Sequence, residues 1–300
     1  MMSNVEAYKH PEYLVETDWL EEHLDDVDLR IFDCSVIVKK NPDQNKDKKI
    51  PFVYQSGRFN FDKIHIPNSG FIDIPNDLSD RSSSIPLMMP SQKQFTDMMG
   101  KYGISNDVRV VLYSTTESNW ATRAWWMMRS FGFNNVAILN GGWAKWKSER
   151  RAVSDQPCKY KPHNISSYSH PGYFSDKADV LLAIADDHSK IINALPQGLY
   201  DGSSDICFGR KGRIAESVNI PFTSLHNMET GCYLPAEQLQ KLYNDVNVND
   251  AEKIIAYCGG GVAASNTAFT LSLLGYENIS VYDGSMLEWG NDSSLPMDIG

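Results

Sequence analysis

The chain has 300 residues and a formal net charge of −10, with 42% hydrophobic and 22% charged residues. This is the composition of a soluble globular protein, and the length predicts two domains of about 150 residues each. An acidic chain does not attract nucleic acid or anionic membrane surfaces, so we expect neither as a partner. The N-terminal residues do not form a signal peptide pattern, and no apolar run is long enough to span a bilayer.

The five cysteines are widely separated and form no CxxC pair. An odd, scattered set is typical of a reducing compartment and argues against a zinc site. We therefore expect a cytoplasmic protein with no metal and no organic cofactor.

The first 150 residues alternate short apolar runs with helical patterns, which predicts a parallel sheet covered by helices on both faces. The elements expected in chain order are a helix capped by Thr17 and ending at Leu24, a strand over 31–34, surface loops over 39–49 and 79–90, a helix capped by Ser91 and ending at Met99, a strand over 109–113, a helix carrying Trp120, Trp125 and Trp126, a strand over 136–139, and a helix over 143–148.

The second half of the chain repeats the first in the same order. The strand over 109–113 followed by Ser114 matches the run over 253–257 followed by Cys258. Segments 140–142 and 283–285 also match, as do the turns that begin at His65 and Arg213. Ordered self-similarity predicts two copies of one α/β domain. We expect them at 1–150 and 172–300, joined by a polar linker over 151–171.

Cys258 follows a buried strand and precedes three glycines and a helix that Gly275 ends. Open α/β sheets place their ligands at this end of a strand. Glycine amides and a helix N-terminus stabilise anions, so they favour the nucleophilic thiolate. The alternative is a structural cysteine beside a turn, because free cysteines are among the most buried residues.

A phosphatase is the main rival interpretation of a cysteine loop of this kind. Phosphatase loops place an arginine six positions after the cysteine, where this chain has Ala264. Without that guanidinium the loop has no bidentate clamp for a phosphoryl group.

Several motifs together resemble the tandem rhodanese family of sulfurtransferases over nearly the whole chain. The most specific are His65-Ile66-Pro67, Ser79-Asp80-Arg81 with Met89-Pro90, Trp125-Trp126-Met127, Asn140-Gly141-Gly142, Val218-Asn219-Ile220-Pro221-Phe222, the loop from Cys258 to Ala263, and Tyr282-Asp283-Gly284-Ser285 with Glu288-Trp289-Gly290. The resemblance implies two rhodanese-like domains sharing one active loop, carried by the second domain. Ser114 stands where the first domain has lost its cysteine.

The resemblance also implies a persulfide cycle on Cys258, with a small-molecule sulfur donor and a thiol or cyanide acceptor, including a thioredoxin-like protein thiol. Covalent catalysis of this kind proceeds in two steps. The backbone amides of Gly259, Gly260, Gly261, Val262 and Ala263 are expected to stabilise the persulfide anion. Cys207 and Cys232 lie in loops of the same half, where a bystander role is expected.

The loop bears on the identity of the donor. Thiosulfate-using relatives carry basic residues after the cysteine, whereas mercaptopyruvate-using relatives carry a glycine, so this loop is similar to the second group. Those relatives also have an arginine where this chain has Leu199, and hydroxyl residues where it has Gly260 and Ala263.

The donor carboxylate is therefore assigned to Arg210 and Arg213, with Arg58 and His65 as residues that could face the loop from the first domain. Each has a plainer interpretation, as a solvated basic turn or a hydrogen-bonded structural histidine. We expect transfer of sulfane sulfur from 3-mercaptopyruvate. The alternatives are transfer from thiosulfate, and a persulfide carrier or sulfide-binding protein with little turnover.

Overall fold

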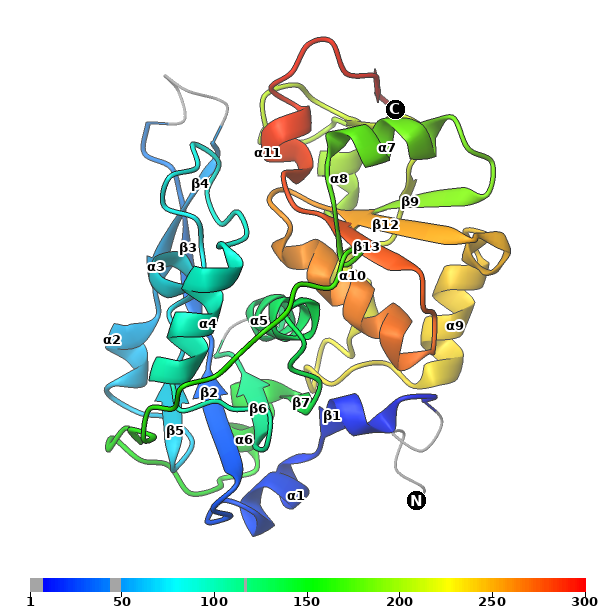
Figure 1. Cartoon of the computed structure of the whole chain (residues 1–300). Coiled ribbons are helices and arrows are strands. Elements are labelled where there is room, and N and C mark those ends of the chain that lie inside the picture. Colours follow the sequence, from blue (N-terminus) through cyan, green and yellow to red (C-terminus); the bar gives the residue numbers. More distant parts are fainter. Residues whose placement is uncertain (1–7, 44–49, 116–117) are drawn as a thin grey trace.

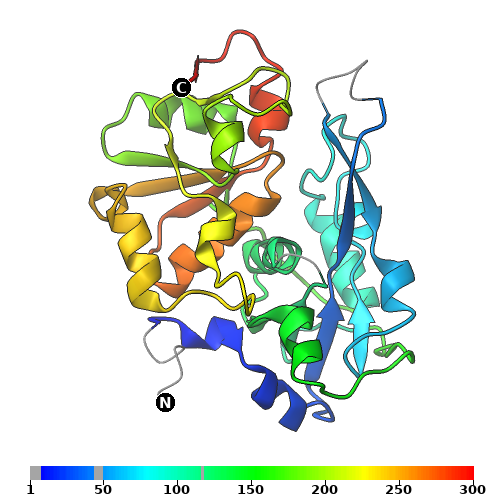
Figure 2. The same cartoon turned by 180° about the vertical axis from the view of Figure 1, so that it is seen from behind.

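Two α/β domains lie side by side in the computed structural model, which describes residues 8–43, 50–115 and 118–300 (Figure 1). Each domain is built on a five-stranded sheet in which every neighbouring pair is parallel. Helices cover both faces of each sheet, as the view from behind also shows (Figure 2). The predicted fold class is confirmed.

The first domain has the strand order β1-β7-β6-β2-β5. Its elements are a 3-10 turn (Pro11–Tyr13), β1 (Leu14–Val15), α1 (Thr17–Glu22), β2 (Leu29–Asp33), β3 (Val36–Lys40), β4 (Phe52–Ser56), α2 (Arg58–Phe61), β5 (Ser69–Phe71), α3 (Ile74–Asp77), α4 (Gln92–Lys101), β6 (Arg109–Tyr113), α5 (Asn119–Ser130), β7 (Val136–Leu139) and α6 (Gly142–Ser148).

The second domain has the strand order β11-β9-β12-β13-β8. Its elements are β8 (Phe174–Ser175), α7 (Lys177–Ile184), β9 (Ser189–Asn193), α8 (Gln197–Tyr200), β10 (Arg213–Ile214), β11 (Val218–Asn219), a 3-10 turn (Phe222–Leu225), α9 (Ala236–Asn244), a second such turn (Val248–Asp250), β12 (Lys253–Tyr257), α10 (Val262–Leu273), β13 (Ile279–Tyr282), α11 (Ser285–Trp289) and β14 (Met297–Asp298).

The internal repeat extends to individual hydrogen bonds. The Tyr113 hydroxyl accepts the N–H of Ile66 at 3.3 Å, and the Tyr257 hydroxyl accepts the N–H of Ile214 at 3.1 Å. The carbonyl of Ser114 accepts from the backbone of α6, just as the carbonyl of Cys258 accepts from the backbone of α11. The two sheets therefore hold Ser114 and Cys258 in corresponding positions.

Two local predictions are wrong. Thr17 is the first residue of α1, and the cap is Glu16, whose side chain makes no capping hydrogen bond. Lys39 and Lys40 belong to β3, which pairs antiparallel with β4, so the predicted loop over 39–49 begins inside a hairpin. Residues 44–49 of that loop lie outside the described residues. Ser91 does cap α4, since its hydroxyl accepts the N–H of Gln94.

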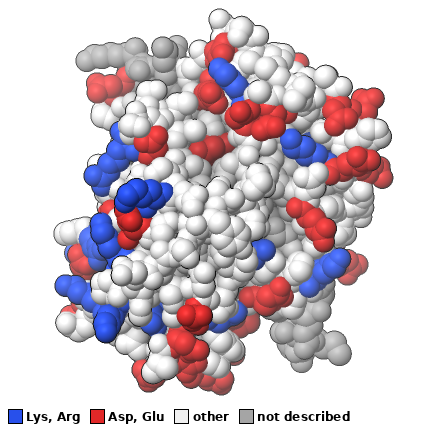
Figure 3. All heavy atoms as spheres, in the orientation of Figure 1, with Lys and Arg blue, Asp and Glu red and all other residues white. Residues whose placement is uncertain are grey.

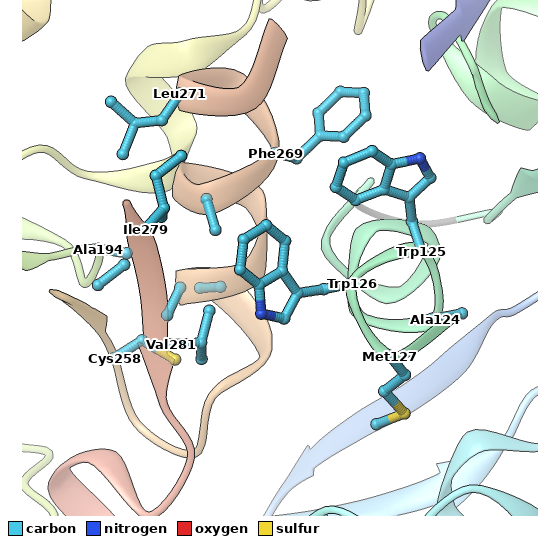
Figure 4. Close-up of a cluster of buried hydrophobic side chains, with 14 of the residues drawn as sticks. Ala124, Trp125, Trp126, Met127, Ala194, Cys258, Phe269, Leu271, Ile279 and Val281 are labelled. Carbon is cyan, nitrogen blue, oxygen red and sulfur yellow. The ribbon is translucent and has the colours of Figure 1, made fainter. Parts of the chain in front are cut away.

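The two domains pack through α5 and α10. Trp125 on α5 points toward Phe269 on α10 (Figure 4), and the two rings meet edge to face at 4.9 Å. Trp126 also extends from α5 toward α10. An edge-to-face aromatic pair stabilises the fold by more than the burial of its apolar surface alone would. The interface is therefore a hydrophobic core shared by both halves.

The segment between the domains crosses the first domain in an extended course (Figure 1). The N–H of Cys158 donates to the carbonyl of Ser69, and the N–H of His163 donates to that of Gly100, both at 2.9 Å. These contacts tie the connection to the first domain and help to fix the relative position of the two sheets.

On the face seen in Figure 3, acidic and basic side chains are interspersed and lie mostly toward the rim. In the described part of the chain, no helix combines the length and the apolar character needed to cross a membrane.

Candidate active site

Cys258 lies at the carboxyl end of β12, the central strand of the second sheet, and is 2% exposed. Its neighbour Gly259 begins the loop that leads into α10. The residue forms part of the wall of a cavity of about 240 Å³. The strand, loop and helix expected from the sequence are thus present, and they form one wall of this cavity, which is partly open to solvent.

Both domains build this cavity. The second domain contributes Leu195, Pro196, Leu199, Phe208, Phe222, Cys258, Gly259, Gly260, Val262 and Ala263, and the first contributes Val38, Phe52, Tyr54, Asn119 and Trp120. The walls are mainly aliphatic and aromatic. No lysine or arginine is among the described residues that line it.

Ser285 holds the loop from behind. Its Oγ accepts the N–H of Cys258 at 3.0 Å and the N–H of Gly261 at 3.2 Å, and it donates to the carbonyl of Tyr282 at 2.7 Å. The backbone of Ser285 has φ of 46°, a strained value for a residue with a side chain. Of the five amides expected to face an anion, that of Gly261 is therefore occupied by Ser285, while Gly259, Gly260, Val262 and Ala263 border the cavity.

Packing explains why glycines occupy the loop. A Cβ on Gly259 would lie 2.5 Å from the Phe208 ring, which is closer than atoms can approach. Gly261 has φ of 75°, in the left-handed region that favours glycine. The loop is thus fitted between Phe208 on one side and the domain interface on the other.

Arg123 of α5 reaches the underside of the loop from the first domain. A Cβ on Gly261 would lie 2.9 Å from its Nη1. The fully buried guanidinium donates from Nη2 to Asp283 Oδ1 at 2.6 Å and to the carbonyl of Leu87 at 2.8 Å. Asp283 Oδ2 accepts the N–H of Met89, so one carboxylate binds the first domain twice.

Tyr54 is a residue of the cavity that the sequence did not reveal. It lies on β4, and its ring meets that of Trp120 edge to face at 6.0 Å. Burial raises the pKa of Tyr54, and the negative charge of the nearby Cys258 raises it further, so the phenol keeps its proton at neutral pH. Its hydroxyl makes no hydrogen bond with any residue that the structure describes.

Arg210 lies outside the cavity. Its guanidinium donates to the carbonyls of Trp289 and Leu295 at 3.0 Å, to that of Asp292 at 2.6 Å and to that of Gly290 at 3.4 Å. The side chain thus closes the turn that follows α11. This placement does not support a direct contact with a donor bound at Cys258.

The other three predicted donor-binding residues are also absent from the cavity wall. Arg213 donates to the carbonyl of Gly300 and stacks on the Tyr200 ring at 4.6 Å. Arg58 lies over the Phe71 ring at 4.6 Å. His65 is fully buried, and its Nδ1 lies 2.7 Å from the carbonyl of Phe61.

The remaining cysteines are free thiols, and Cys207 and Cys232 are partly buried. Neither is among the residues lining the cavity of Cys258. In the described ranges, no group of three or more His, Cys, Asp or Glu residues is placed to hold a metal ion.

Comparison with known proteins gives a consistent result. Residues 16–149 and 177–292 each match the Rhodanese-like domain family. The chain is 31% identical over 288 residues to 3-mercaptopyruvate sulfurtransferase of Escherichia coli K12, covering 95% of this chain and 98% of that protein. It is also 31% identical over 285 residues to thiosulfate sulfurtransferase of Rattus norvegicus, covering 92% of this chain and 91% of that protein.

Among solved structures, the chain is similar to SseA from Escherichia coli, described as a 3-mercaptopyruvate sulfotransferase. The TM-score is 0.78 at 29% identity, with 91% of this chain and 98% of that chain covered. The fold and the site together define a class of protein. Its members have two α/β domains, and a cysteine loop lies at the interface between them. The chain belongs to the rhodanese family, and the relatives from Escherichia coli and Rattus norvegicus are both sulfurtransferases.

Proposed function

We propose that this sulfurtransferase takes a sulfane sulfur from 3-mercaptopyruvate and passes it to a thiol or to cyanide through a persulfide on Cys258. The main support is the position of Cys258, at the end of a central strand and on the wall of a cavity that both domains line. The likeness to 3-mercaptopyruvate sulfurtransferase over 95% of the chain supports the same donor.

The first half-reaction loads the enzyme. The Cys258 thiolate attacks the donor sulfur, an S–S bond forms and the donor C–S bond breaks. The electron pair leaves with the carbon as the enolate of pyruvate, which takes up the proton of the donor thiol. The products are pyruvate and the Cys258 persulfide anion.

The second half-reaction unloads it. An acceptor thiolate or cyanide attacks the outer sulfur, and the Cys258 thiolate leaves. The products are the acceptor persulfide or thiocyanate. A thioredoxin-like protein thiol is one acceptor of this kind. Because all five cysteines are free, we place the protein in a reducing compartment, the cytoplasm.

The loop supplies the anion site in this proposal. The amides of Gly259, Gly260, Val262 and Ala263 stabilise the outer sulfur, since these residues border the cavity. Ser285 keeps the loop in place by accepting hydrogen bonds from the amides of Cys258 and Gly261. The domains at 1–150 and 172–300 act as one unit, since the first supplies a wall of the cavity.

Donor choice follows from charge. Thiosulfate carries two negative charges next to its reacting sulfur, whereas mercaptopyruvate carries one, several bonds from its sulfur. A cavity whose described lining has no cation disfavours the first donor more strongly. Thiosulfate sulfurtransferase remains the alternative, because such a protein is equally similar in sequence.

The test is to incubate the protein with each donor and to measure the mass of its cysteine peptides. Mercaptopyruvate should add one sulfur, about 32 Da, to the Cys258 peptide. Cys258→Ser should abolish loading and turnover, whereas Cys207→Ser should change neither. Loading of Cys207 or Cys232 would show that the assigned nucleophile is wrong. Faster turnover with thiosulfate would overturn the donor, and loading without turnover would favour the carrier function.

A further inference from the structure

The cavity raises a problem of charge. A bound 2-oxo acid brings a carboxylate, and burying an unpaired carboxylate costs far more than the rest of the donor can offset. Arg210 and Arg213 are engaged elsewhere, and the lining includes neither lysine nor arginine among the described residues. The carboxylate must therefore meet a cation at the mouth of the cavity rather than at its base.

The β3–β4 hairpin of the first domain forms one wall of this mouth. Val38, Phe52 and Tyr54 of the hairpin line the cavity. Phe52 also packs against Phe208 across the domain boundary, with ring centroids 6.1 Å apart. One face of the hairpin is thereby turned toward Cys258.

The register places Lys40 on that same face. Val38 pairs with Tyr54, and Lys40 pairs with Phe52. Side chains of directly paired residues project to the same side, and residues two apart on a strand do so as well. Lys40 therefore lies beside Phe52, two pairs further toward the hairpin end than Val38. Lys39 pairs with Val53 and projects to the opposite face.

Lys40 is free to bind an anion. Its side chain is exposed, and it forms no ion pair with any other described residue. An ammonium group on a flexible four-carbon stem can reach over the neighbouring ring toward the cavity. A carboxylate held there would lie several bonds from the sulfur at Cys258, which is how a mercaptopyruvate molecule is built.

Tyr54 supplies a second polar group on the same face. Tyr54 lines the same cavity as Cys258, and its hydroxyl has no hydrogen-bond partner among the described residues. The negative charge of Cys258 also raises the pKa of this phenol, as expected for neighbouring groups. A protonated phenol at this point can donate to the keto oxygen of the donor. Negative charge collects on that oxygen when the C–S bond breaks.

We propose that the hairpin of the first domain is the donor-binding element, in which Lys40 binds the carboxylate of a 2-oxo thiol acid and Tyr54 donates to its keto oxygen. The inference rests on the proposed function. It assigns a substrate-binding role to the domain that has lost its own nucleophile.

The experiment compares Lys40→Met with Lys39→Met, two removals of one charge from adjacent residues on opposite faces. With mercaptopyruvate as donor, Lys40→Met should raise KM about tenfold, with little change in kcat, because a carboxylate is held alike in the ground and transition states. Lys39→Met should leave both constants within about twofold of the unmodified protein. Tyr54→Phe should instead lower kcat about tenfold or more, because its hydrogen bond strengthens as the oxygen gains charge.

Inorganic polysulfide is the control donor, since it has neither a carboxylate nor a keto oxygen. Its kcat at saturating concentration should be the same in all three variants, which shows that the hairpin and the loop remain intact. Equal effects of the two lysine changes, or equal losses with both donors, would overturn the role of the hairpin while leaving the proposed function standing. An unmodified protein that accepts polysulfide sulfur but no mercaptopyruvate sulfur would overturn both.

Discussion

Among single residues, Ser285 is expected to contribute strongly to both activity and stability, because its hydroxyl oxygen accepts hydrogen bonds from two amides of the active loop. Ser285→Ala should lower kcat/KM about tenfold and reduce the free energy of unfolding by about 1–3 kcal/mol, the cost of leaving buried amides unpaired. Steady-state kinetics and urea unfolding measure the two effects.

The control is Ser272→Ala. The hydroxyl of Ser272 also bonds to a backbone carbonyl, that of Ala268, but it lies within α10, away from the loop. Its removal should leave kcat/KM unchanged. Similar kinetic losses in both variants would mean that Ser285 does not position the loop.

Asp33 is a buried carboxyl in the first domain that the reaction does not use. Its Oδ1 accepts the N–H of Ser35 at 2.7 Å, and its Oδ2 has no partner among the described residues. Burial raises the pKa of Asp33 from 3.8 to about 6. The folded state therefore binds the proton more tightly than the unfolded state, and this residue lowers stability as pH rises through 6.

The second domain has Asn193 in the corresponding place, with the same contact to a backbone N–H at 2.7 Å. Asp33→Asn should therefore raise the free energy of unfolding by about 1–3 kcal/mol at pH 8, and the gain should disappear near pH 4. Urea unfolding at both pH values tests this, with the exposed Asp97→Asn as the control. A gain that does not depend on pH would contradict the buried charge as its cause.

Sequence reasoning succeeded for the cysteine loop because the loop is local. A buried strand, Cys258, three glycines and a helix follow one another, and each rule needs only neighbouring residues. Tyr54, Arg123 and Ser285 were missed as parts of the site because they meet the loop only through tertiary packing. Arg210 was assigned to the donor for the same reason, since nothing in the sequence shows that four carbonyls already bind its guanidinium.

At the scale of whole elements, buried strands were predicted best. The structure gives β6 (Arg109–Tyr113) and β7 (Val136–Leu139) the predicted bounds. Short apolar runs between polar turns are typical of buried strands, so the pattern was sufficient here. The β3–β4 hairpin was missed because lysines and a proline around its turn are typical of a solvated loop. What defines it is the pairing of segments 36–40 and 52–56, which the linear pattern does not contain.

A further prediction concerns two elements on opposite domains, α8 and the β3–β4 hairpin, which both line the cavity. Leu199 on α8 lines the cavity from the second domain, and Lys40 approaches it from the hairpin. If the donor needs one cation, then Leu199→Arg should restore most of the affinity lost in Lys40→Met, bringing KM for mercaptopyruvate to within about threefold of the unmodified value. A charged hydrogen bond contributes about 1.5–3 kcal/mol, which is enough for this.

Leu199→Met in the same Lys40→Met background is the control, because it changes the shape of the wall without adding charge. It should restore nothing. Equal recovery with methionine and arginine would show that packing, rather than charge, limits donor binding.

At the scale of the whole molecule, one active site needs two domains. The first domain holds Ser114 where the second holds Cys258, yet it provides the hairpin wall, Trp120 and the guanidinium beneath the loop. The shared core between α5 and α10 fixes these parts relative to one another (Figure 4). The domain that has serine at this position thus contributes structural parts to the active site of the other.

Arg123 and Asp283 form a buried ion pair in this interface. Its atoms are 2.6 Å apart, and the two side chains are 0% and 9% exposed. Removing one partner of a buried pair leaves the other charge without compensation, so Asp283→Asn should reduce the free energy of unfolding by about 3–5 kcal/mol. Because the same guanidinium lies next to the loop at Gly261, sulfur transfer should also fall at temperatures where the variant is fully folded.

Asp97→Asn provides the contrast, since it breaks the ion pair between Lys93 and Asp97. The Lys93 side chain is 85% exposed and that of Asp97 is 52% exposed. Solvent screens such a pair, so the change should cost less than about 1 kcal/mol and leave sulfur transfer intact. Urea unfolding gives the stabilities, and mercaptopyruvate turnover well below the unfolding transition gives the activity. If Asp283→Asn cost no more than Asp97→Asn, the α5–α10 core and the other hydrogen bonds between the domains would hold them without help from this ion pair. The loop would then owe its position to Ser285 rather than to the first domain.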